Sequence, residues 1–179
     1  LRSVEKALAS VGANVILSQD ADKISGAEKI VLPGVGAFGD CMNGLRKIDA
    51  IDLVRTLVFK KPLLGICVGM QMLFETSDEL GNYEGLGILP GFVTRFDDKG
   101  IRVPHTGWNQ FEIKSKNILM DGISSGSYAY FNHSYYCVPQ NLSDVVSYTE
   151  YGDAFCSVVG HDNLYGIQFH PEKSQDIGL

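Results

Sequence analysis

The sequence predicts an α/β fold: a mostly parallel central sheet flanked by helices, with an additional antiparallel sheet. Three observations lead to this prediction. Short apolar runs of strand length alternate with helical patterns as far as Phe74, which is typical of βα units. A glycine-flanked cysteine, Cys67, directly follows one of these runs. From Glu84 onward, short β-type segments succeed one another with little helix between them, as in hairpins.

The composition is that of one globular domain of ordinary size. The chain has 179 residues, of which 45% are hydrophobic, and no internal repeat or low-complexity segment. We therefore expect a single domain over residues 1–179. The formal net charge is −6, with acidic and basic residues interspersed. This pattern argues against a nucleic-acid or membrane surface and favours a small neutral or zwitterionic substrate.

The cysteines and histidines lack the spacing of a metal site. Neither a CxxC nor an HxxxH pair occurs among Cys41, Cys67, Cys137, Cys156, His105, His133, His161 and His170. No metal or other cofactor is therefore predicted. Reduced thiols in the cytoplasm are the simplest explanation of the cysteine pattern. The sequence shows no signal peptide and no apolar run of about 18 residues, which predicts a cytoplasmic protein.

The elements can be placed in order along the chain. Val4, Ala7, Leu8 and Val11 have helical spacing before Gly12, so the first element is a helix. A βα alternation would place a strand before that helix, and residues 173–179 read as the start of another. We therefore expect that a first strand and a C-terminal helix are missing from this sequence. Further strands are predicted at residues 15–17, 29–32 and 63–66, helices from the 33–40 loop to Lys47, over residues 51–58 and at 70–74, and β-type segments near Ile88 and at residues 92–93, 111–113, 129–131, 135–138, 145–148 and 163–172.

Cys67 is the strongest candidate for a nucleophile. It lies between a buried strand and a helical pattern, and Gly65 and Gly69 on either side leave room for a sharp, strained turn. The free amides at the start of the helix would stabilise a thiolate, and the amide of Val68 would point to where an oxyanion forms. The same pattern also fits a cysteine packed as a small hydrophobe between two packing glycines.

Residues 33–40 form a glycine-rich loop after a predicted strand. The loop lacks both the GxxxxGK[ST] lysine and the GxGxxG spacing, so phosphate binding is disfavoured. It is better suited to bring backbone amides close to Cys67 at the carboxyl edge of a parallel sheet, although a tight βα turn alone would look the same. Gln71 and Glu75 are four residues apart on the predicted helix after Cys67, so they would share a face, or else be ordinary solvated residues.

The last predicted strand ends in His170-Pro171-Glu172. In an extended chain, residues two apart face the same way, so the histidine and the glutamate would project to one side. This arrangement suits a general base with a carboxylate that fixes its tautomer, provided that the pair abuts Cys67. A solvated pair is the alternative.

Several stretches together resemble the signature blocks of the class I, triad-type glutamine amidotransferases. The two that carry this resemblance are Gly65-Ile66-Cys67-Val68-Gly69-Met70-Gln71 and Gln168-Phe169-His170-Pro171-Glu172. Within that family, four further segments closely resemble the glutaminase subunits of imidazole glycerol phosphate synthase. They are Leu32-Pro33-Gly34-Val35-Gly36-Ala37-Phe38-Gly39-Asp40, Val103-Pro104-His105-Thr106-Gly107-Trp108-Asn109, Phe131-Asn132-His133-Ser134-Tyr135-Tyr136 and Pro171-Glu172-Lys173-Ser174-Gln175.

The resemblance implies a flavodoxin-like fold and hydrolysis of glutamine to glutamate and ammonia. Cys67 would be the nucleophile, His170 the proton carrier and Glu172 the group that orients it. Amides of Val68 and of the Val35–Gly36 loop would hold the oxyanion. The positions that would hold glutamine are Gly36, Val68, Gln71, Ser134 and Tyr135, with Glu75 as a less certain addition.

The resemblance also implies a partner. The family passes its ammonia through a channel to a (β/α)8-barrel cyclase subunit, with which it forms a heterodimer that makes imidazole glycerol phosphate and aminoimidazole carboxamide ribotide in histidine biosynthesis. Trp108 and Lys173 are candidates for that interface, and core packing is the alternative for Trp108. Two other classes stay open: a paralogous amidotransferase that supplies a sugar-modifying partner, and a regulatory subunit without activity, against which the intact triad argues.

Overall fold

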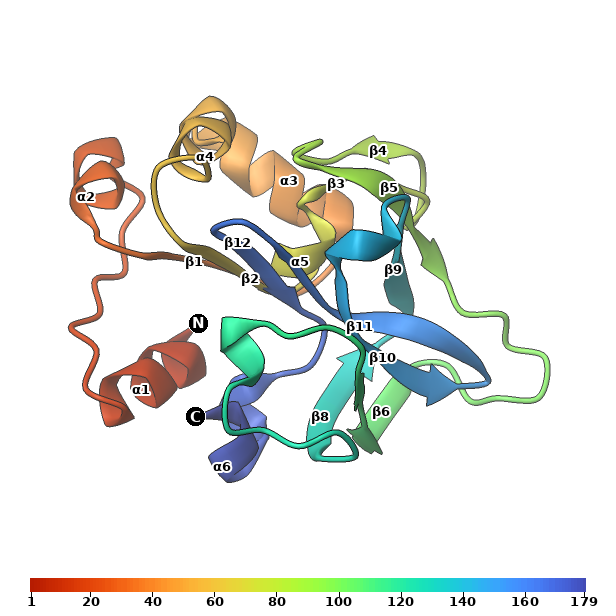
Figure 1. The fold of residues 1–179 in the computed structure, drawn as a ribbon. Coiled ribbons are helices and arrows are strands. Elements are labelled where there is room, and N and C mark those ends of the chain that lie inside the picture. The colour runs from red at the N-terminus through yellow and green to blue at the C-terminus, as the bar shows by residue number, and fades with distance from the viewer.

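The computed structural model describes residues 1–179 (Figure 1). Its helices are α1 (Arg2–Ser10), α2 (Ala21–Gly26), α3 (Phe38–Lys47), α4 (Ile51–Leu57), α5 (Val68–Gln71) and α6 (Gln175–Gly178), with 3₁₀ turns η1 (Ile118–Met120), η2 (Leu142–Asp144) and η3 (Pro171–Lys173). The strands are β1 (Ile30–Gly34), β2 (Leu63–Cys67), β3 (Phe74–Ser77), β4 (Tyr83–Glu84), β5 (Leu89–Arg95), β6 (His105–Gln110), β7 (Glu112–Ile113), β8 (Tyr128–His133), β9 (Tyr135–Pro139), β10 (Val145–Tyr151), β11 (Asp153–His161) and β12 (Leu164–Ile167). None of the helices has the length and apolar character needed to cross a membrane.

The strands form one large mixed sheet and one small antiparallel sheet. The large sheet has the order β1-β2-β12-β11-β9-β5-β3-β4, with β10 beside β11 and β7 beside β10. Strands β1, β2 and β12 are parallel, as are β3 and β5, and the other neighbours are antiparallel. Strands β6 and β8 form the second, antiparallel sheet. The predicted α/β class, with its parallel strands and its additional antiparallel sheet, is confirmed.

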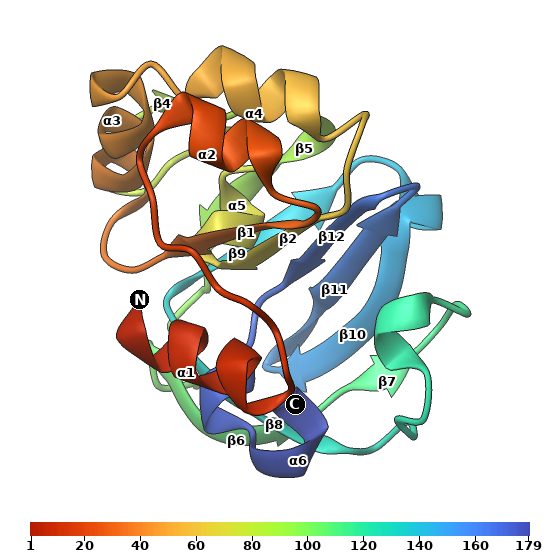
Figure 2. The same cartoon turned by 90° about the vertical axis from the view of Figure 1, so that its left-hand side faces the viewer.

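The parallel strands bring distant segments to one edge of the sheet. β2 lies between β1 and β12, with Gly34 opposite Cys67 and Ile167 opposite Ile66. The carboxyl ends of all three strands therefore meet at the same place. Figures 1 and 2 show α2, α3 and α4 on one side of these strands, and α1, α6 and the β6–β8 sheet on the other.

The core is one cluster of 31 buried apolar residues that runs along both sides of the large sheet. Its largest fully buried side chains include Phe38 from α3, Phe74 from β3 and Phe131 from β8. Since the core includes Cys67 and Val68, the end of β2 is anchored by core packing.

Most predicted elements are confirmed, namely the helices α1, α3 and α4, the strands β1 and β2, and the strand-rich second half. The predicted strand at residues 15–17 is wrong. This segment has no ladder hydrogen bonds, and Ile16 and Leu17 are 66% and 63% exposed. A strand exists only when it is paired, and no other strand lies against these residues.

The predicted helix at residues 70–74 is also wrong beyond its first turn, because α5 ends at Gln71 and Phe74 begins β3. The carbonyl of Met72 accepts from the amide of Leu86, and that of Leu73 accepts from the amides of Ile88 and Leu89. These long-range hydrogen bonds replace the helical ones, so tertiary pairing overrides the local pattern.

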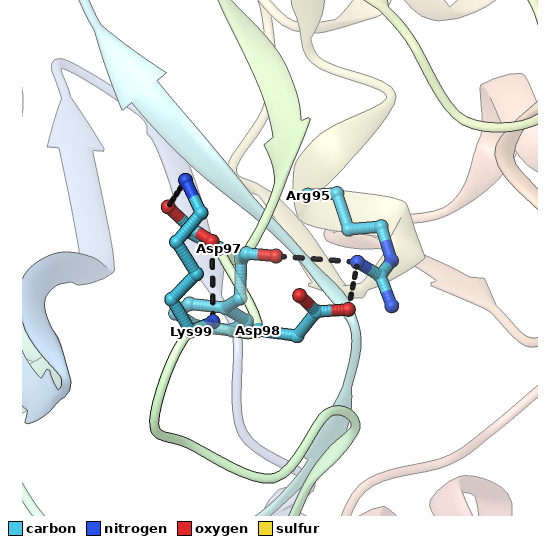
Figure 3. A network of polar contacts seen from close by, with 5 residues as sticks. Arg95, Asp97, Asp98 and Lys99 are labelled. Atoms are coloured by element: carbon cyan, nitrogen blue, oxygen red, sulfur yellow. Dashed lines mark hydrogen bonds and ion pairs between the residues drawn. The ribbon is translucent and has the colours of Figure 1, made fainter.

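A small polar network orders the exposed loop that follows β5 (Figure 3). Arg95 Nη1 donates to the Phe96 carbonyl at 3.5 Å and pairs with Asp98 at 3.3 Å, while Lys99 pairs with Asp97 at 3.4 Å. These side chains are largely solvated, and such ion pairs contribute about 0–1 kcal/mol each. The network thus shapes the loop without deciding the fold.

The close approach of α5 to β1 predicts a large effect at Gly69. A Cβ there would collide with the backbone carbonyl of Leu32, which cannot move out of the way as a side chain could. Gly69→Ala should therefore lower the free energy of unfolding by about 3 kcal/mol or more. The control is Gly44→Ala in the exposed part of α3, where a Cβ meets nothing and should raise stability by about 0.5–1 kcal/mol. Denaturant unfolding of both variants checks this, and equal effects would contradict the predicted constraint.

Candidate functional site

The site is built around the backbone of Cys67. This residue has φ 54° and ψ −112° and links β2 directly to α5, so the predicted sharp turn is present. A non-glycine residue adopts a positive φ at some cost, which surrounding packing must offset. Gly65 and Gly69 pack against each other beneath the turn, and a Cβ on Gly65 would lie 2.6 Å from the Gly69 carbonyl oxygen. The flanking glycines are thus required by the close approach of backbones.

His170 reaches Cys67 from the neighbouring strand. It follows β12 by three residues, and it lines the same cavity as Cys67. Its backbone is fixed at both ends: its amide donates to the Tyr130 carbonyl at 2.9 Å, and its carbonyl accepts from Ser174 Oγ at 2.6 Å. The topology therefore places the two predicted reactive groups side by side.

Glu172 holds the far side of the His170 ring. His170 Nδ1 donates to Glu172 Oε1 at 3.1 Å. The predicted contact is present, but the predicted reason for it is wrong: Glu172 lies in the 3₁₀ turn η3 rather than on an extended strand. Proline at the first position of η3 favours the tight turn, and the turn brings the carboxylate back to the ring.

The electrostatics of the pair favour a charged histidine. The hydrogen bond with Cys67, and next that with Glu172, raise the pKa of His170 to about 9, against the opposing effect of burial. Burial is the largest single effect on Glu172 and acts to raise its pKa. The hydrogen bond with His170, a backbone hydrogen bond and the charges of His170 and Lys173 together outweigh burial and keep that pKa below its ordinary value. His170 is therefore protonated at neutral pH, and an imidazolium beside a cysteine favours the thiolate.

Cys67 and His170 open onto a cavity of about 300 Å³. Its lining residues are Gly34, Val35, Gly36, Cys67, Val68, Gln71, Glu79, Pro104, Asn132, His133, Ser134, Tyr135 and His170. The cavity brings together seven of the residues predicted for the site besides Cys67. They are Val35, Gly36, Val68, Gln71, Ser134, Tyr135 and His170. The volume is suited to a ligand of amino-acid size.

Glu75 is not part of this cavity. It lies on β3 and not on α5, its Oε2 accepts from the Gly91 amide at 2.9 Å, and it lines a separate open hollow of about 500 Å³ beside β5 and β9. The predicted shared helix face with Gln71 is therefore wrong, because α5 ends before Glu75. The structure removes Glu75 from the candidate substrate contacts.

Glu79 is an acidic residue of this cavity that the sequence analysis missed. It lines the cavity, and its Oε2 accepts from the Phe38 amide at the start of α3 at 2.7 Å. Burial raises the pKa of this carboxyl group. No sequence signal marks it, because it lies in a polar stretch after β3 without periodicity or motif.

Gln71 is buried at 2% exposure and has a fixed orientation. Its Nε2 donates to the Tyr135 carbonyl at 3.0 Å and to Gln168 Oε1 at 3.1 Å. Both amide hydrogens are used, so its Oε1 is the atom left to accept from a bound ligand.

Trp108 and Lys173 lie outside the cavity, where they contact the same tyrosine. The Trp108 ring is 47% exposed and packs edge-to-face on Tyr130 with centroids 6.1 Å apart, while Lys173 Nζ lies 5.3 Å from the Tyr130 ring centroid. Trp108 is thus not a core residue. We call Trp108, Tyr130 and Lys173 the aromatic surface cluster.

Comparison with known proteins assigns the family. The family model described as glutamine amidotransferase class-I matches residues 1–177. The chain therefore belongs to the class I glutamine amidotransferase family.

Curated relatives narrow this assignment. The chain is 47% identical to the imidazole glycerol phosphate synthase subunit HisH of Salinibacter ruber, a match that covers all of the chain and 85% of the relative. It is 47% identical to the HisH subunit of Aquifex aeolicus, with 100% and 87% covered, and 44% identical to that of Syntrophotalea carbinolica, with 100% and 90% covered. The resemblance found from the motifs, down to this subunit type, is confirmed.

Solved structures support the fold. A crystal structure of a glutamine amidotransferase matches with a TM-score of 0.77 at 21% identity, covering 99% of this chain and 88% of that one. A second glutamine amidotransferase, from Thermotoga maritima, matches with a TM-score of 0.64 at 17% identity, covering 94% and 69%. The arrangement of strands and helices is therefore that of known glutamine amidotransferases.

The site predicts a large difference in reactivity among the cysteines. Burial raises the pKa of Cys41, Cys137 and Cys156, whereas Cys67 lies beside the protonated His170. A thiolate reacts and a thiol does not, so a glutamine-like chloroketone or iodoacetamide should modify Cys67 first in the folded protein. Peptide mass spectrometry after limited labelling measures the order, and modification of Cys41 before Cys67 would contradict the assignment.

Proposed function

We propose that this chain hydrolyses glutamine to glutamate and ammonia through Cys67, His170 and Glu172, and passes the ammonia to a cyclase partner in histidine biosynthesis. The observation that carries the proposal is the strained Cys67 turn, which shares one cavity with a histidine held by a carboxylate. The family and the HisH relatives support the same chemistry.

The first half-reaction begins from a thiolate and an imidazolium. The Cys67 sulphur attacks the side-chain carbonyl carbon of glutamine, and the electron pair of the C=O bond moves onto oxygen. As the tetrahedral intermediate collapses, His170 gives its proton to the leaving amine and ammonia departs. A glutamyl thioester remains on Cys67. His170, now neutral, takes a proton from water, whose oxygen attacks the thioester, and glutamate leaves as the thiolate re-forms.

The oxyanion is held by backbone amides at the two strand ends. The amide of Val68 follows the nucleophile directly, and the loop after β1 supplies a second donor from Val35 or Gly36. Gly36 has φ 97°, a conformation that glycine adopts freely. Each well-placed donor contributes roughly 3–4 kcal/mol to the transition state.

The α-amino and α-carboxylate groups of glutamine need polar partners at the cavity wall. We assign Glu79 to the ammonium group of glutamine, because Glu79 is the carboxylate among the residues that line the cavity. The Oε1 of Gln71 and the backbone of Ser134 and Tyr135 supply the remaining acceptors and donors. These contacts discriminate a free amino acid from a peptide-bound glutamine, whose nitrogen carries no charge.

The partner is proposed from the relatives, which are named as subunits. A (β/α)8-barrel cyclase would bind as the second half of a heterodimer, receive the ammonia through a channel and form imidazole glycerol phosphate and aminoimidazole carboxamide ribotide. We place the interface on the aromatic surface cluster, whose exposed tryptophan, half-buried tyrosine and exposed lysine are typical of interface anchors. A cytoplasmic location follows from this pathway.

Substitution of the triad should separate three roles. Cys67→Ala should abolish glutamine hydrolysis, and His170→Asn should nearly do so. Glu172→Gln should lose less, because the carboxylate orients the ring without transferring a proton. Glu79→Gln, outside the triad, should mainly raise KM, because it removes the charge proposed to hold the ammonium group of glutamine. Steady-state glutamate release measures all four variants, with circular dichroism as the control for folding. Wild-type rates for His170→Asn would overturn the assignment of the proton carrier.

Partner binding should stimulate the glutaminase. The Val35–Gly36 loop can present an amide or a carbonyl to the oxyanion, so its second donor can be supplied or withheld by a partner that reorders it. Adding the barrel cyclase with its nucleotide ligand should raise the rate on the order of 10²-fold, as expected for one gained donor. Lys173→Glu should weaken this effect, whereas Lys60→Glu in the exposed turn after α4 should not. A chain fully active alone, or one stimulated only by a sugar-modifying enzyme, would contradict the proposed partner.

A further inference from the structure

The buried side chain of Gln168 contacts the nucleophile. Gln168 follows β12 by one residue, is 0% exposed, and is anchored by its amide, which donates to the Ser157 carbonyl at 2.9 Å. Its side-chain Nε2 lies 3.7 Å from Cys67 Sγ, a distance within reach of a hydrogen bond to sulphur. Cys67 Sγ is therefore the acceptor for the Gln168 Nε2 group.

The orientation of the Gln168 side-chain amide follows from its hydrogen-bond partners on the side away from Cys67. The Tyr135 carbonyl can only accept, so the Gln71 atom that faces it at 3.0 Å must be the donor Nε2. The same nitrogen faces Gln168 at 3.1 Å, which requires the acceptor Oε1 there. Gln168 must then direct its own NH₂ group at Cys67. If the side-chain amide of Gln71 or Gln168 were flipped, two acceptor oxygens or two donor nitrogens would face each other in a buried place, which is costly.

A pair of histidines fixes the Tyr135 carbonyl from its other side. His133 Nδ1 donates to this carbonyl at 2.8 Å, which leaves its Nε2 to accept from His105 Nδ1 at 3.1 Å. Asn109 Nδ2 in turn donates to His105 Nε2 at 3.2 Å. Burial lowers the pKa of His105 to about 4 and that of His133 to about 3. Both rings are therefore neutral near pH 7, and these tautomers are maintained.

We propose that Gln168 is a further catalytic residue: its side-chain amide donates to the Cys67 sulphur, favours the thiolate and aims it at the substrate. Gln71, His133 and the Tyr135 carbonyl act as positioning groups, because they set which end of the Gln168 amide faces the sulphur. The inference rests on the proposed function, in which Cys67 reacts as a thiolate. Cys67 is only 4% exposed, so protein donors must replace the water that would otherwise solvate the charge.

Other titratable groups also face Cys67, and the test must leave them unchanged. Those that line its cavity or lie close to it are His170, Glu79, His133, Tyr135, Cys41 and Cys137. Replacing Gln168 by methionine keeps the length and bulk of the side chain, removes only the amide, and alters none of these groups.

The experiment measures the pH dependence of Cys67 alkylation by iodoacetamide in the complete protein. Gln168→Met should move the alkylation midpoint upward by about one pH unit, the effect of losing one hydrogen bond to a charged group. Its kcat for glutamine should fall at least 10-fold while KM changes less than 3-fold. The control is Ser157→Ala, which removes a buried hydroxyl that bonds Ser147 on the neighbouring strand at 2.8 Å and should leave the midpoint in place.

An unchanged midpoint in folded Gln168→Met would overturn the proposal. If that variant fails to fold, NMR of the wild-type protein decides: the Gln168 side-chain NH₂ signals should shift with pH at the alkylation midpoint, and this shift should vanish in Cys67→Ala. NH₂ signals that do not follow the midpoint would equally overturn it. Alkylation needs no glutamine, so the two proposals can fail separately. If the midpoint shifts in Gln168→Met but the wild-type protein shows no glutaminase activity, the role of Gln168 stands and only the proposed function is refuted.

Discussion

The left-handed backbone of Cys67 is the constraint on which the rest of the site depends. A non-glycine residue keeps a φ of 54° only where the surrounding structure holds its backbone in that conformation. Here β2 is buried between two parallel strands, and Gly69 lies so close to the Leu32 carbonyl that α5 must start at once. The turn therefore lifts the thiol off the sheet at the edge where the loop after β1 and the segment after β12 both arrive.

Charge around the sulphur is balanced by groups from the segment that follows β12. The protonated His170 faces the sulphur, and Glu172 in turn stabilises the cation from behind. Gln168 offers a neutral donor from beneath. These donors are already in place before the charge forms, and such preorganisation is what makes electrostatic stabilisation effective. The hydrogen bonds of the neutral pair His105 and His133 connect this site to β6 and β8.

The sequence predicted those parts of the structure that depend on local pattern. The run before Cys67 and its flanking glycines indicated the strand and the turn, and the family motifs indicated His170 and Glu172. Contacts set by long-range pairing escaped prediction. Residues 72–74 have a helical pattern but bond to the segment after β4, which carries Glu75 away from the cavity. Glu79 reaches the site only through tertiary folding, and nothing in its own segment marks it. Gln168 belongs to a recognised motif, but only the folded structure brings its NH₂ group to Cys67.

The central claim is that Cys67 carries the glutamyl group during turnover. Rapid acid quenching of the protein with glutamine, followed by peptide mass spectrometry, tests it directly, because a thioester survives acid long enough to be located. The account predicts one glutamyl group on the peptide that contains Cys67, absent when glutamine is omitted and lost on neutralisation. Glutamate formation without an acylated Cys67, or with the acyl group on another cysteine, would contradict it.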